Sequence, residues 1–392
     1  MRPHKYLILG AGRMARGLVH YLASADDGAQ FHLVDIKKEH IKLLRSSLPE
    51  STRRRLTASV MDLSASSKIL GLMSRCDVAL SAAHYRFNRN LTRMAIATQC
   101  HMVDLGGNVD AVKAQLGLDA QARRKSVAII PDCGLAPGMT NILALWAAGR
   151  LDRIDSIRIR VGGVPVRPSP PLNYMMVFSP EGLINEYIED ALAIRNGRVK
   201  RLPSLAEVEP LRFPPPFGLM EAFNTSGGSS TLVETLKGRV RHLDYKTIRY
   251  PGHCRIMQGL KQLGLFSSRP FMAGKTRGPA PRELAGILFE NNLPQEGRDA
   301  VLVRVIARGT RKGRKSSVAV NLIDMMDRRS DLTAMMRCTA FPAACIAWML
   351  AAGKITRRGV LPQEKAVPAD AFVRAMRRAG LNIRIKTRNI SH

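Results

Sequence analysis

Residues 244–253, with the sequence DYKTIRYPGH, carry six titratable side chains in one strand-length segment. Written as a β-strand, the segment places Thr247 and Arg249 on one face and Lys246 on the other. An arginine held on a strand can bind a carboxylate through two parallel hydrogen bonds. His253 follows a Pro-Gly turn, where an imidazole can serve as an acid or a base. A basic edge strand with a capping histidine explains the same residues, so the segment alone leaves both interpretations open.

A second candidate binding segment, TSGGS, occupies residues 225–229. Thr225 and Ser226 supply hydroxyl groups, and the glycines that follow them supply accessible backbone N–H groups. This combination suits a carboxylate or a phosphate, although an exposed turn has the same composition. The six cysteines are scattered and form no CxxC or Cys/His pattern, which predicts reduced core thiols and no metal site.

The N-terminal segment GAGRMA, residues 10–15, predicts a dinucleotide site because it follows an apolar strand and opens a helical pattern. Gly10 permits the tight turn, and Gly12 lets the backbone approach a pyrophosphate. The helix would begin at Arg13 and Met14, and its N-terminal N–H groups and dipole favour negative charge there.

Asp35 stands at the end of the second predicted strand. Its carboxylate would accept hydrogen bonds from ribose hydroxyls and repel a 2′-phosphate, which favours NAD and leaves NADP as the alternative. Lys37 and Lys38 can reach a 2′-phosphate, but we interpret them as exposed residues of the next helix. Asp62 either touches the adenine side or caps a helix. Further cofactor contacts are expected beyond the carboxyl ends of the later strands, at Ala82, Asp104, Gly106 and Asp132.

The elements that position these residues follow from the apolar pattern. Short apolar runs alternate with amphipathic stretches and predict a doubly wound parallel sheet, as in a Rossmann fold. These runs lie at residues 6–9, 31–34, 55–60, 77–82, 101–105 and 127–131. Later strands at 156–165, 301–309 and 317–324 predict a second α/β domain on a mixed or antiparallel sheet. Residues 332–353 predict a long buried helix kinked at Pro342.

The charge balance is strongly basic, with 61 Lys and Arg against 31 Asp and Glu, a formal charge of +30. Such a surface attracts anions, but no nucleic-acid-reading motif accompanies it, so we expect no specific nucleic-acid partner. The chain starts almost directly with an apolar strand, and no apolar run approaches membrane-spanning length. A cytoplasmic protein without a membrane partner is the expectation.

Several long segments resemble one known family, the saccharopine dehydrogenase-like reductases, and most closely its L-lysine 6-dehydrogenase branch. The resemblance extends from residue 5 to about residue 375. The segments that carry it are GAGRMA (10–15), VDLGG (103–107), PDCGLAPGM (131–139), VGGVPVRPSPPLNYMMVFSPEGLINEY (161–187), EAFNTSGGSSTL (221–232) and YKTIRYPGH (245–253).

The resemblance implies an NAD-binding Rossmann domain at residues 1–135 and a substrate domain at 136–340. A C-terminal helical segment at 341–392 would pack back on the first domain. The implied reaction converts L-lysine, NAD⁺ and water into 2-aminoadipate 6-semialdehyde, ammonia and NADH, and the semialdehyde cyclises to piperideine-6-carboxylate. The family tends to form homo-oligomers, so a homodimer or homotetramer is expected.

The resemblance also suggests residue roles in a substrate cleft. Arg249 would bind the α-carboxylate with help from Thr225 and Ser226. Tyr174, Lys246 and His253 are the candidates to orient or deprotonate the amine, because hydride loss requires a neutral ε-amine.

Three other functions remain open at this point. A reductase of the same family would condense an amino acid with a semialdehyde, as in saccharopine or carboxynorspermidine formation. A non-catalytic NAD-binding protein would keep the cleft without chemistry. A nucleic-acid-associated protein would show steeply salt-dependent binding.

Overall fold

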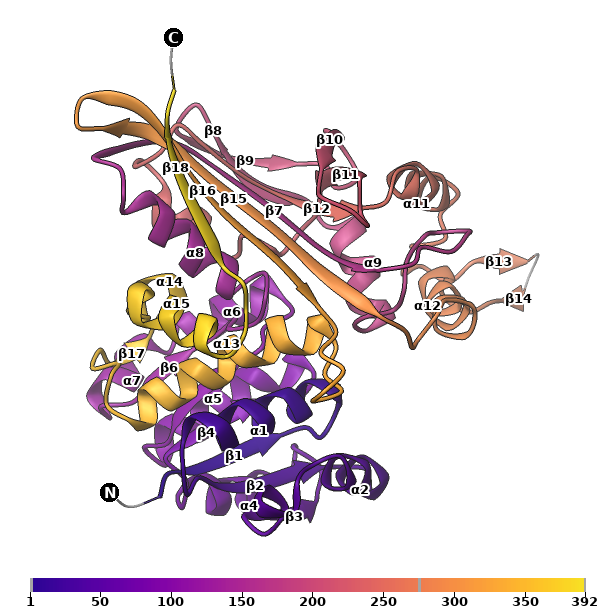
Figure 1. The fold of residues 1–392 in the computed structure, drawn as a ribbon. Helices are drawn as coiled ribbons and strands as arrows, with labels where there is room; N and C mark the ends of the chain where they lie inside the picture. The colour runs from indigo at the N-terminus through magenta and orange to yellow at the C-terminus, as the bar shows by residue number, and fades with distance from the viewer. Residues whose placement is uncertain (1–2, 274–275, 391–392) are drawn as a thin grey trace. The chain divides into compact units, whose positions relative to one another are not determined.

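The computed structural model describes residues 3–273 and 276–390, and the chain forms two compact units (Figure 1). Unit 1 contains Met1–Trp146 and Met336–Ile383, and unit 2 contains Ala147–Met335 and Arg384–His392. The division between the units falls after Trp146, inside helix α8 (Met139–Ala148), whereas the domain boundary predicted from the sequence lies at 135/136. The ends of the predicted ranges, residues 1–2 and 391–392, lie outside the described residues.

Unit 1 is built on a parallel sheet with the strand order β17-β6-β5-β4-β1-β2-β3. Its strands are β1 (Lys5–Leu9), β2 (Gln30–Asp35), β3 (Leu56–Val60), β4 (Val78–Ser81), β5 (His101–Asp104), β6 (Ala128–Ile130) and β17 (Gly359–Val360). The predicted doubly wound sheet is confirmed, and each of the first six strands matches an apolar run. The strand order reverses between β1 and β4, the point where such sheets bind ligands.

Helices cover this sheet because its strands are apolar on both faces. Leu7, Ile8 and Leu33 are fully buried in it. The helices are α1 (Arg13–Ala25), α2 (Lys38–Ser46), α3 (Glu50–Arg53), α4 (Ser66–Met73), η1 (Tyr85–Phe87), α5 (Asn88–Ala97), α6 (Val109–Leu116), α7 (Asp119–Arg124), α8, α13 (Ala334–Ala351), α14 (Gln363–Ala366) and α15 (Ala369–Arg378). A Cβ added at Gly17 would lie 2.7 Å from the Cβ of Ala340, so glycine allows α1 and α13 to pack closely.

Helix α13 corrects one expectation from the sequence. Its 18 residues are long and apolar enough to cross a membrane, although no apolar run was expected to approach that length. In the structure 78% of this stretch is buried, including Ala340, Cys345 and Ile346. The helix contains Pro342, as predicted, and its burial is that of a core helix.

Unit 2 is built on a mixed sheet with the main order β10-β11-β12-β7-β15-β16-β18, to which β8 and β9 are added beside β12. Its strands are β7 (Arg153–Pro165), β8 (Ala191–Arg195), β9 (Arg198–Leu202), β10 (Glu209–Arg212), β11 (Leu219–Asn224), β12 (His242–Arg249), β15 (Asp299–Arg311), β16 (Arg314–Met325) and β18 (Arg384–Asn389). Strands β7 and β12 run parallel, whereas β15 pairs antiparallel with both β7 and β16. The three strands predicted for this region are thus present and longer than predicted.

The helices of unit 2 gather at one end of this sheet (Figure 1). They are α9 (Pro180–Ile188), α11 (His253–Gln262) and α12 (Pro281–Asn292), while the short α10 (Leu232–Leu236) contacts β8. A small hairpin, β13 (Met272–Ala273) with β14 (Thr276–Arg277), forms a separate sheet.

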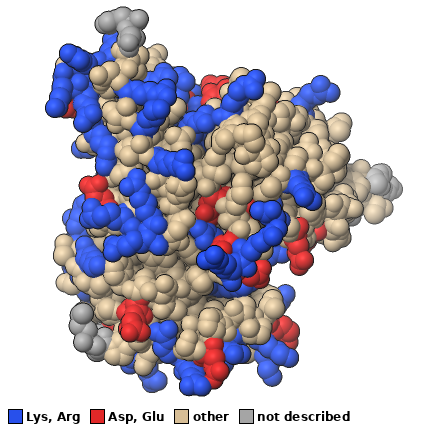
Figure 2. Space-filling model, in the orientation of Figure 1, with Lys and Arg blue, Asp and Glu red and all other residues tan. Residues whose placement is uncertain are grey.

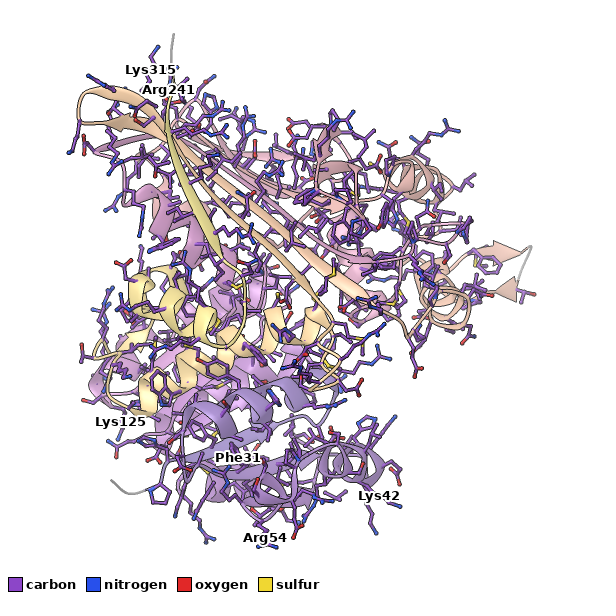
Figure 3. All side chains as sticks on the ribbon, viewed as in Figure 1. Phe31, Lys42, Arg54, Lys125, Arg241 and Lys315 are labelled. Atoms are coloured by element: carbon purple, nitrogen blue, oxygen red, sulfur yellow. The ribbon has the colours of Figure 1, made fainter. Side chains whose placement is uncertain are left out.

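The end of the chain differs from the helical segment that was expected at residues 341–392. Residues 384–389 form the mostly exposed edge strand β18, which pairs antiparallel with β16 and belongs to unit 2. Basic side chains outnumber acidic ones across the visible face in Figure 2. Exposed examples labelled in Figure 3 are Lys42, Arg54, Lys125, Arg241 and Lys315. The positive charge is thus spread over both units and is not confined to one groove.

Candidate functional site

The loop between β1 and α1 forms the predicted turn at the strand-order reversal. Gly10 has a φ of +100°, a conformation that favours glycine. A Cβ at this position would lie 2.9 Å from the carbonyl oxygen of Ala82, whose own N–H donates to the Leu9 carbonyl at 2.8 Å. Gly10 and Ala82 therefore bring the ends of β1 and β4 into close contact.

The N-terminus of α1 is open to an anion. Gly12 is its N-cap residue and has no side chain to accept hydrogen bonds from the first N–H groups of the helix, and the first turn holds no acidic residue. A Cβ added at Gly12 would have no heavy atom within 4 Å. Arg13 is exposed and Met14 is half-buried in the first turn. The residues present therefore fit a pyrophosphate, which the helix dipole and the N–H groups would hold.

Asp35 ends β2 next to this loop. Its Oδ2 accepts the Ala11 N–H at 2.7 Å, and its Oδ1 accepts the Lys37 N–H at 2.8 Å. His40 lies 3.2 Å from the same Oδ1. These contacts hold the carboxylate at the edge of the glycine-rich turn, the position expected for a ribose-binding residue.

Asp62 has a local role in the structure. Its Oδ1 accepts hydrogen bonds from the N–H and the hydroxyl of Ser64, each at 2.8 Å, and the residue is exposed. Helix α4 begins at Ser66 with Ala65 as its N-cap. Asp62 therefore organises the turn before α4 and does not cap the helix itself.

Asp104 ties together the loops that follow β5 and β6. Its Oδ1 accepts the N–H groups of Gly106 and Asp132, and its Oδ2 accepts the side-chain amide of Gln115 at 2.8 Å. Burial raises the pKa of Asp104. A Cβ at Gly106 would lie 1.9 Å from Asp132 Oδ1, so only glycine fits there. The cofactor candidates on this side thus form one compact group of loops.

Cys133 lies in the same group of loops but is a packing residue. The thiol is fully buried, and it donates to the Ile130 carbonyl at 3.2 Å. Burial raises the pKa of Cys133 well above its usual value, so no reactive thiolate forms.

In unit 2 the guanidinium of Arg249 occupies the end of β12 and is only 3% exposed. Its Nη1 donates to the Ile248 carbonyl at 3.0 Å, and its plane lies over the ring of Tyr174, with 4.9 Å from Cζ to the centroid. The nearest carboxylate oxygen, Glu186 Oε2, is 3.8 Å from Nη2. A buried arginine without a bidentate partner among the described residues is suited to a carboxylate ligand.

Arg249 begins a directed chain of hydrogen bonds. Its Nε donates to the hydroxyl of Tyr187 at 3.3 Å, and that hydroxyl lies 2.9 Å from His253 Nε2. His253 Nδ1 lies 2.9 Å from the Leu172 carbonyl, which can only accept. Nδ1 therefore carries the proton, and the neutral ring accepts the Tyr187 hydroxyl at Nε2. This series of hydrogen bonds fixes the guanidinium of Arg249 through the hydroxyl of Tyr187.

This geometry argues against the acid–base role on the amine that the resemblance suggested for His253. The ring is 2% exposed and stacks on Phe223, with a centroid distance of 6.3 Å. Burial, with a contribution from the Arg249 charge, lowers its pKa to about 3. Because both ring nitrogens are engaged and the ring resists protonation, His253 is a positioning residue.

The pKa of His253 predicts an acid-sensitive contribution to stability. Between its ordinary pKa of 6.5 and about 3, the unfolded chain binds a proton that the folded chain excludes. The protonation of His253 should therefore lower the free energy of unfolding by ~1.4 kcal/mol for each pH unit of acidification in this window. The contributions of other titrating groups add to this value.

Urea unfolding between pH 6.5 and 4.5 measures this contribution. The His253→Asn protein should be less stable at pH 6.5 but show a shallower decline with acidification. Equal slopes for the two proteins would contradict the assignment.

Tyr174 and Tyr187 stay protonated at this site. Burial raises the pKa of both phenols, that of Tyr187 to about 12, although the Arg249 charge opposes the shift. The hydroxyl of Tyr174 is buried and meets no hydrogen-bond partner at full geometry within the described part of the chain, although the nearby backbone N–H of Val177 acts to lower its pKa. Tyr174 is therefore an available donor and not a base.

Glu186 was missed by the sequence analysis. It precedes Tyr187 on α9, and burial raises its pKa to about 7 even though Arg249 acts to lower it. The side chain keeps 29% of its exposure, so a ligand has access to it. Its only signal in the sequence was its place at the end of the 161–187 segment, because its pKa depends on tertiary burial.

Thr225 and Ser226 lie beside this cluster. The hydroxyl of Thr225 is 2.6 Å from that of Thr247, on the Arg249 face of β12. Ser226 donates to the Asn185 carbonyl at 3.2 Å, which ties the TSGGS loop to α9. A Cβ at Gly228 would overlap the ring of Tyr245, so this loop covers the face of the strand that carries Arg249. The two hydroxyls therefore position the cluster.

Lys246 is separated from the cluster, which corrects its expected role on the amine. It lies on the opposite face of β12, and its Nζ donates to the Glu207 carbonyl at 2.5 Å and to Glu209 Oε2 at 3.2 Å. It belongs to a network of three basic and three acidic side chains: Arg160, Arg195, Lys246, Glu207, Glu209 and Asp244. Burial acts to raise the pKa of Asp244, but the basic neighbours outweigh it and lower that pKa. Lys246 therefore stabilises the sheet.

Together, Arg249 on β12 and Glu186 on α9 form an adjacent cation and anion. A free α-amino acid carries a carboxylate and an ammonium on a single carbon. The 3.8 Å separation of the two side chains matches the recognition of such a head group, with arginine for the carboxylate and glutamate for the ammonium.

Comparison with known proteins gives two matches to family models that together span most of the chain. Residues 6–130 match the model described as saccharopine dehydrogenase NADP binding domain. Residues 134–381 match the model described as saccharopine dehydrogenase C-terminal domain.

Individual relatives agree with these matches. The mitochondrial alpha-aminoadipic semialdehyde synthase of Bos taurus is 24% identical over 281 residues, which is 69% of this chain and 29% of that protein. Saccharopine dehydrogenase [NADP(+), L-glutamate-forming] of Saccharomyces cerevisiae is 23% identical over 66% of this chain and 58% of the relative. The chain thus spans about a third to somewhat over half of the length of these relatives.

A solved structure shows the same fold. The apo saccharopine dehydrogenase (L-Glu forming) from Saccharomyces cerevisiae superimposes with a TM-score of 0.80 at 17% identity. The superposition covers 98% of this chain and 100% of the yeast chain. The parallel sheet and the mixed sheet therefore both have counterparts there.

Proposed function

The chain belongs to the saccharopine dehydrogenase family, and from that premise we propose that it oxidises the ε-carbon–nitrogen bond of L-lysine with NAD⁺. L-lysine, NAD⁺ and water would give 2-aminoadipate 6-semialdehyde, ammonia, NADH and a proton, and the semialdehyde would cyclise to piperideine-6-carboxylate. The observation that carries the proposal is the buried Arg249 beside Glu186, because this pair suits an amino-acid head group.

In this proposal the residues of unit 2 bind and orient the substrate. Arg249 holds the α-carboxylate, and Glu186, when ionised, holds the α-ammonium. The hydrogen bonds that link Arg249, Tyr187 and His253 keep the guanidinium in place. The ε-amine, at the far end of the side chain, must be neutral before a hydride can leave its carbon, and exclusion of water lowers the cost of the neutral form.

Unit 1 would hold the cofactor. The N-terminus of α1 fits the pyrophosphate, and Asp35 fits the ribose hydroxyls. When bound, the nicotinamide supplies the hydride acceptor. We propose NAD in preference to NADP because a carboxylate at the end of β2 repels a 2′-phosphate, although the matching family model is described as NADP binding.

A second candidate function follows from the yeast relative, whose name specifies L-glutamate formation and NADP(+). Here the oxidised nitrogen would carry an amino-acid substituent, as in saccharopine, so that an amino acid leaves in place of ammonia. The same Arg249 and Glu186 pair would hold the lysine-derived head group.

One assay separates these candidates. The purified 392-residue protein is mixed with NAD⁺ or NADP⁺ and with lysine, ornithine or saccharopine, and reduced nicotinamide, ammonia and glutamate are measured. Reduction with lysine and an equal yield of ammonia supports the leading proposal. Reduction with saccharopine alone, with glutamate as product, selects the second candidate, and no reduction with any substrate contradicts both.

The raised pKa of Glu186 predicts the pH dependence of substrate binding. The carboxyl is protonated below about pH 7 and then cannot hold an ammonium group. The value of kcat/KM for lysine should therefore show an additional rise of about tenfold for each pH unit below 7, on top of the rise that deprotonation of the ε-amine of the substrate causes over the whole range. Glu186→Gln should lower kcat/KM and remove this additional rise, whereas the exposed Glu181→Gln on the same helix should retain it. An unchanged profile in Glu186→Gln would contradict the role.

A further inference from the structure

The two faces of the mixed sheet in unit 2 differ in burial along β15 and β16. Val305 and Val318 are fully buried on one face. The residues that follow them, Ile306 and Ala319, point to the opposite face and are half-buried, and Arg308 on that face is exposed. The sheet therefore has a buried face and a second face that is open to solvent, which we call the outer face.

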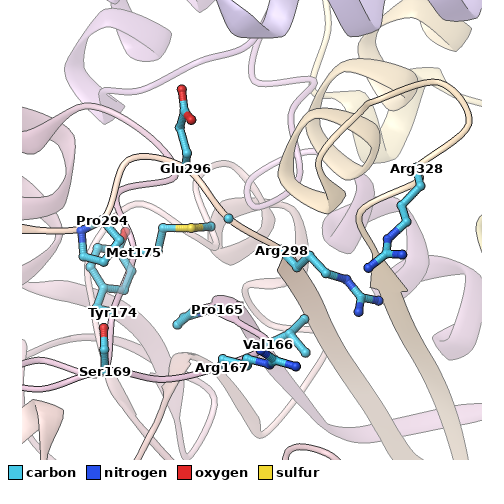
Figure 4. Close-up of a pocket in the computed structure, with 11 residues that line it drawn as sticks. Pro165, Val166, Arg167, Ser169, Tyr174, Met175, Pro294, Glu296, Arg298 and Arg328 are labelled. Atoms are coloured by element: carbon cyan, nitrogen blue, oxygen red, sulfur yellow. The ribbon is translucent and has the colours of Figure 1, made fainter.

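The candidate site lies on the buried face. The register places Thr247 of β12 beside Val161 of β7, and Val161 beside Val303 of β15. Thr247 and Arg249 share a face of β12, so both belong to the buried face. A cavity of about 340 Å³ is lined in part by Tyr174, whose ring packs on Arg249, and so belongs to the same site (Figure 4). The outer face is separate from that site.

Three rows of side chains cross β15, β16 and β18 on the outer face. The register aligns Arg308 with Ser317 and Arg388, Ile306 with Ala319 and Lys386, and Arg304 with Asn321 and Arg384. Directly opposite residues of an antiparallel pair share a face, so each row is a set of neighbours. Every row contains a cation, and none of these aligned positions holds Asp or Glu.

The cations of the outer face lack carboxylate partners. Arg308, Lys386 and Arg388 are exposed, and within the described part of the chain their side chains make no ion pair. Arg304 donates to neutral acceptors, which are Asn321 Oδ1 at 3.1 Å and a backbone carbonyl at 2.9 Å. Neighbouring like charges repel one another, and a bound anion would relieve this repulsion.

The cations are arranged in a line. Arg384, Lys386 and Arg388 alternate along β18, so that successive cations are about 7 Å apart. The line continues to the turn between β15 and β16, residues 311–315 with the sequence RKGRK, where the Lys315 carbonyl accepts the backbone N–H that follows β18 at 2.8 Å. Basic side chains gather in the part of Figure 2 where Figure 1 places this turn and β18. A line of repeated cations suits a long anion with regularly repeated charges.

The other side chains of the outer face narrow the choice of partner. The aligned positions include no aromatic residue on which single-stranded bases could stack. Their one large apolar side chain, Ile306, is half-buried between cations and offers little to the interior of a membrane. A second copy of the same face would bring like charges together. These features favour a double-stranded polyanion.

We propose that the outer face at β15, β16 and β18 binds the phosphate backbone of a nucleic-acid duplex without reading its sequence. Arg308, Lys386 and Arg388 contact phosphates, and the release of condensed counterions from the duplex drives the association. Phosphate contacts position a protein but carry no sequence information. The inference is independent of the reaction proposed above, because the surface lies on the opposite face of the sheet from Arg249.

Fluorescence anisotropy of short labelled duplexes, titrated with the purified 392-residue protein at about 50 to 200 mM salt, tests the surface. The test variant is Arg308→Gln/Lys386→Gln/Arg388→Gln. The control variant removes the same charge from exposed positions of unit 1: Lys42→Gln/Arg75→Gln/Lys125→Gln. Near-UV circular dichroism checks that both variants are folded. Co-sedimentation with phosphatidylserine vesicles and sedimentation velocity of the protein alone test for a membrane partner and for self-association.

The wild type should bind duplexes of unrelated sequence equally. Each phosphate contact contributes about −0.9 to the slope of log K against log salt concentration, so the slope of the test variant should be shallower by about 2.7. Its Kd at about 50 mM salt should rise at least tenfold, while the control variant keeps the wild-type slope.

Equal losses in the two variants would assign the binding to net charge alone and overturn the proposal. It is also overturned if the wild type binds no duplex, or binds the vesicles but not the duplex. A test variant that changes the oligomeric state and leaves duplex binding intact would show that the outer face is a contact between copies of the chain, which likewise refutes the proposal.

Discussion

Replacing Arg249 with lysine should lower kcat/KM for L-lysine by about 100- to 1000-fold and leave the Kd for NAD⁺ unchanged. Lysine keeps the charge but provides no planar pair of donors for a carboxylate. The loss of a buried charge-assisted pair costs about 2–5 kcal/mol, which corresponds to this range. Most of the effect should be in KM, because the carboxylate is bound equally in the ground state and the transition state.

Matched controls separate binding from folding. Arg249→Lys also weakens the hydrogen bond to Tyr187, so its thermal stability must be measured beside its kinetics. Arg158→Ala removes an exposed arginine from the neighbouring strand β7 and should leave both quantities unchanged. A folded Arg249→Lys protein with wild-type KM would refute the assignment of the carboxylate to Arg249.

The second large effect is expected at the N-terminus of α1. Gly12→Asp would place a carboxylate where the pyrophosphate binds, and charge repulsion should raise the Kd for NAD⁺ by at least about 100-fold. The folded protein should not be weakened, because the added side chain meets open space and an acidic group favours a helix N-terminus. Tryptophan fluorescence or titration calorimetry with NAD⁺ measures the change.

Gly71→Asp is the control for this substitution. Gly71 also has open space around its Cβ position and lies in α4 of the same unit, away from the glycine-rich turn. It should bind NAD⁺ as the wild type does. If Gly12→Asp and Gly71→Asp bind NAD⁺ equally well, the cofactor does not lie at the start of α1.

Most of the fold follows from local pattern, because buried parallel strands are continuous apolar runs. The runs at residues 6–9 and 31–34 became β1 and β2 with one or two added residues. The exceptions have a physical reason. Strand β18 is rich in Arg and Lys, and its pairing with β16 depends on long-range register that a local hydrophobic pattern does not carry.

Part of the candidate site was also predictable from local pattern, because side chains alternate between the two faces of a strand. Alternation along residues 244–250 placed Arg249 and Thr247 on one face, and the structure covers that face with the TSGGS loop. The separate location of Lys246 follows from the same alternation, but its acidic partners at 207 and 209 are remote in sequence. Glu186 and the locked state of His253 depend on burial, which only the assembled unit supplies.

The chain passes between the two units three times, after residues 146, 335 and 383. During synthesis, unit 1 therefore cannot be completed until α13 and β17 have been made, and the mixed sheet cannot be completed until β18 has been made. At ordinary translation speed residues 336–392 take roughly 3–11 s to emerge. Until α13 (Ala334–Ala351) has emerged, the apolar surface that it later covers stays exposed, so a message that stalls or terminates before residue 336 yields a product with both sheets incomplete and a strong requirement for chaperones.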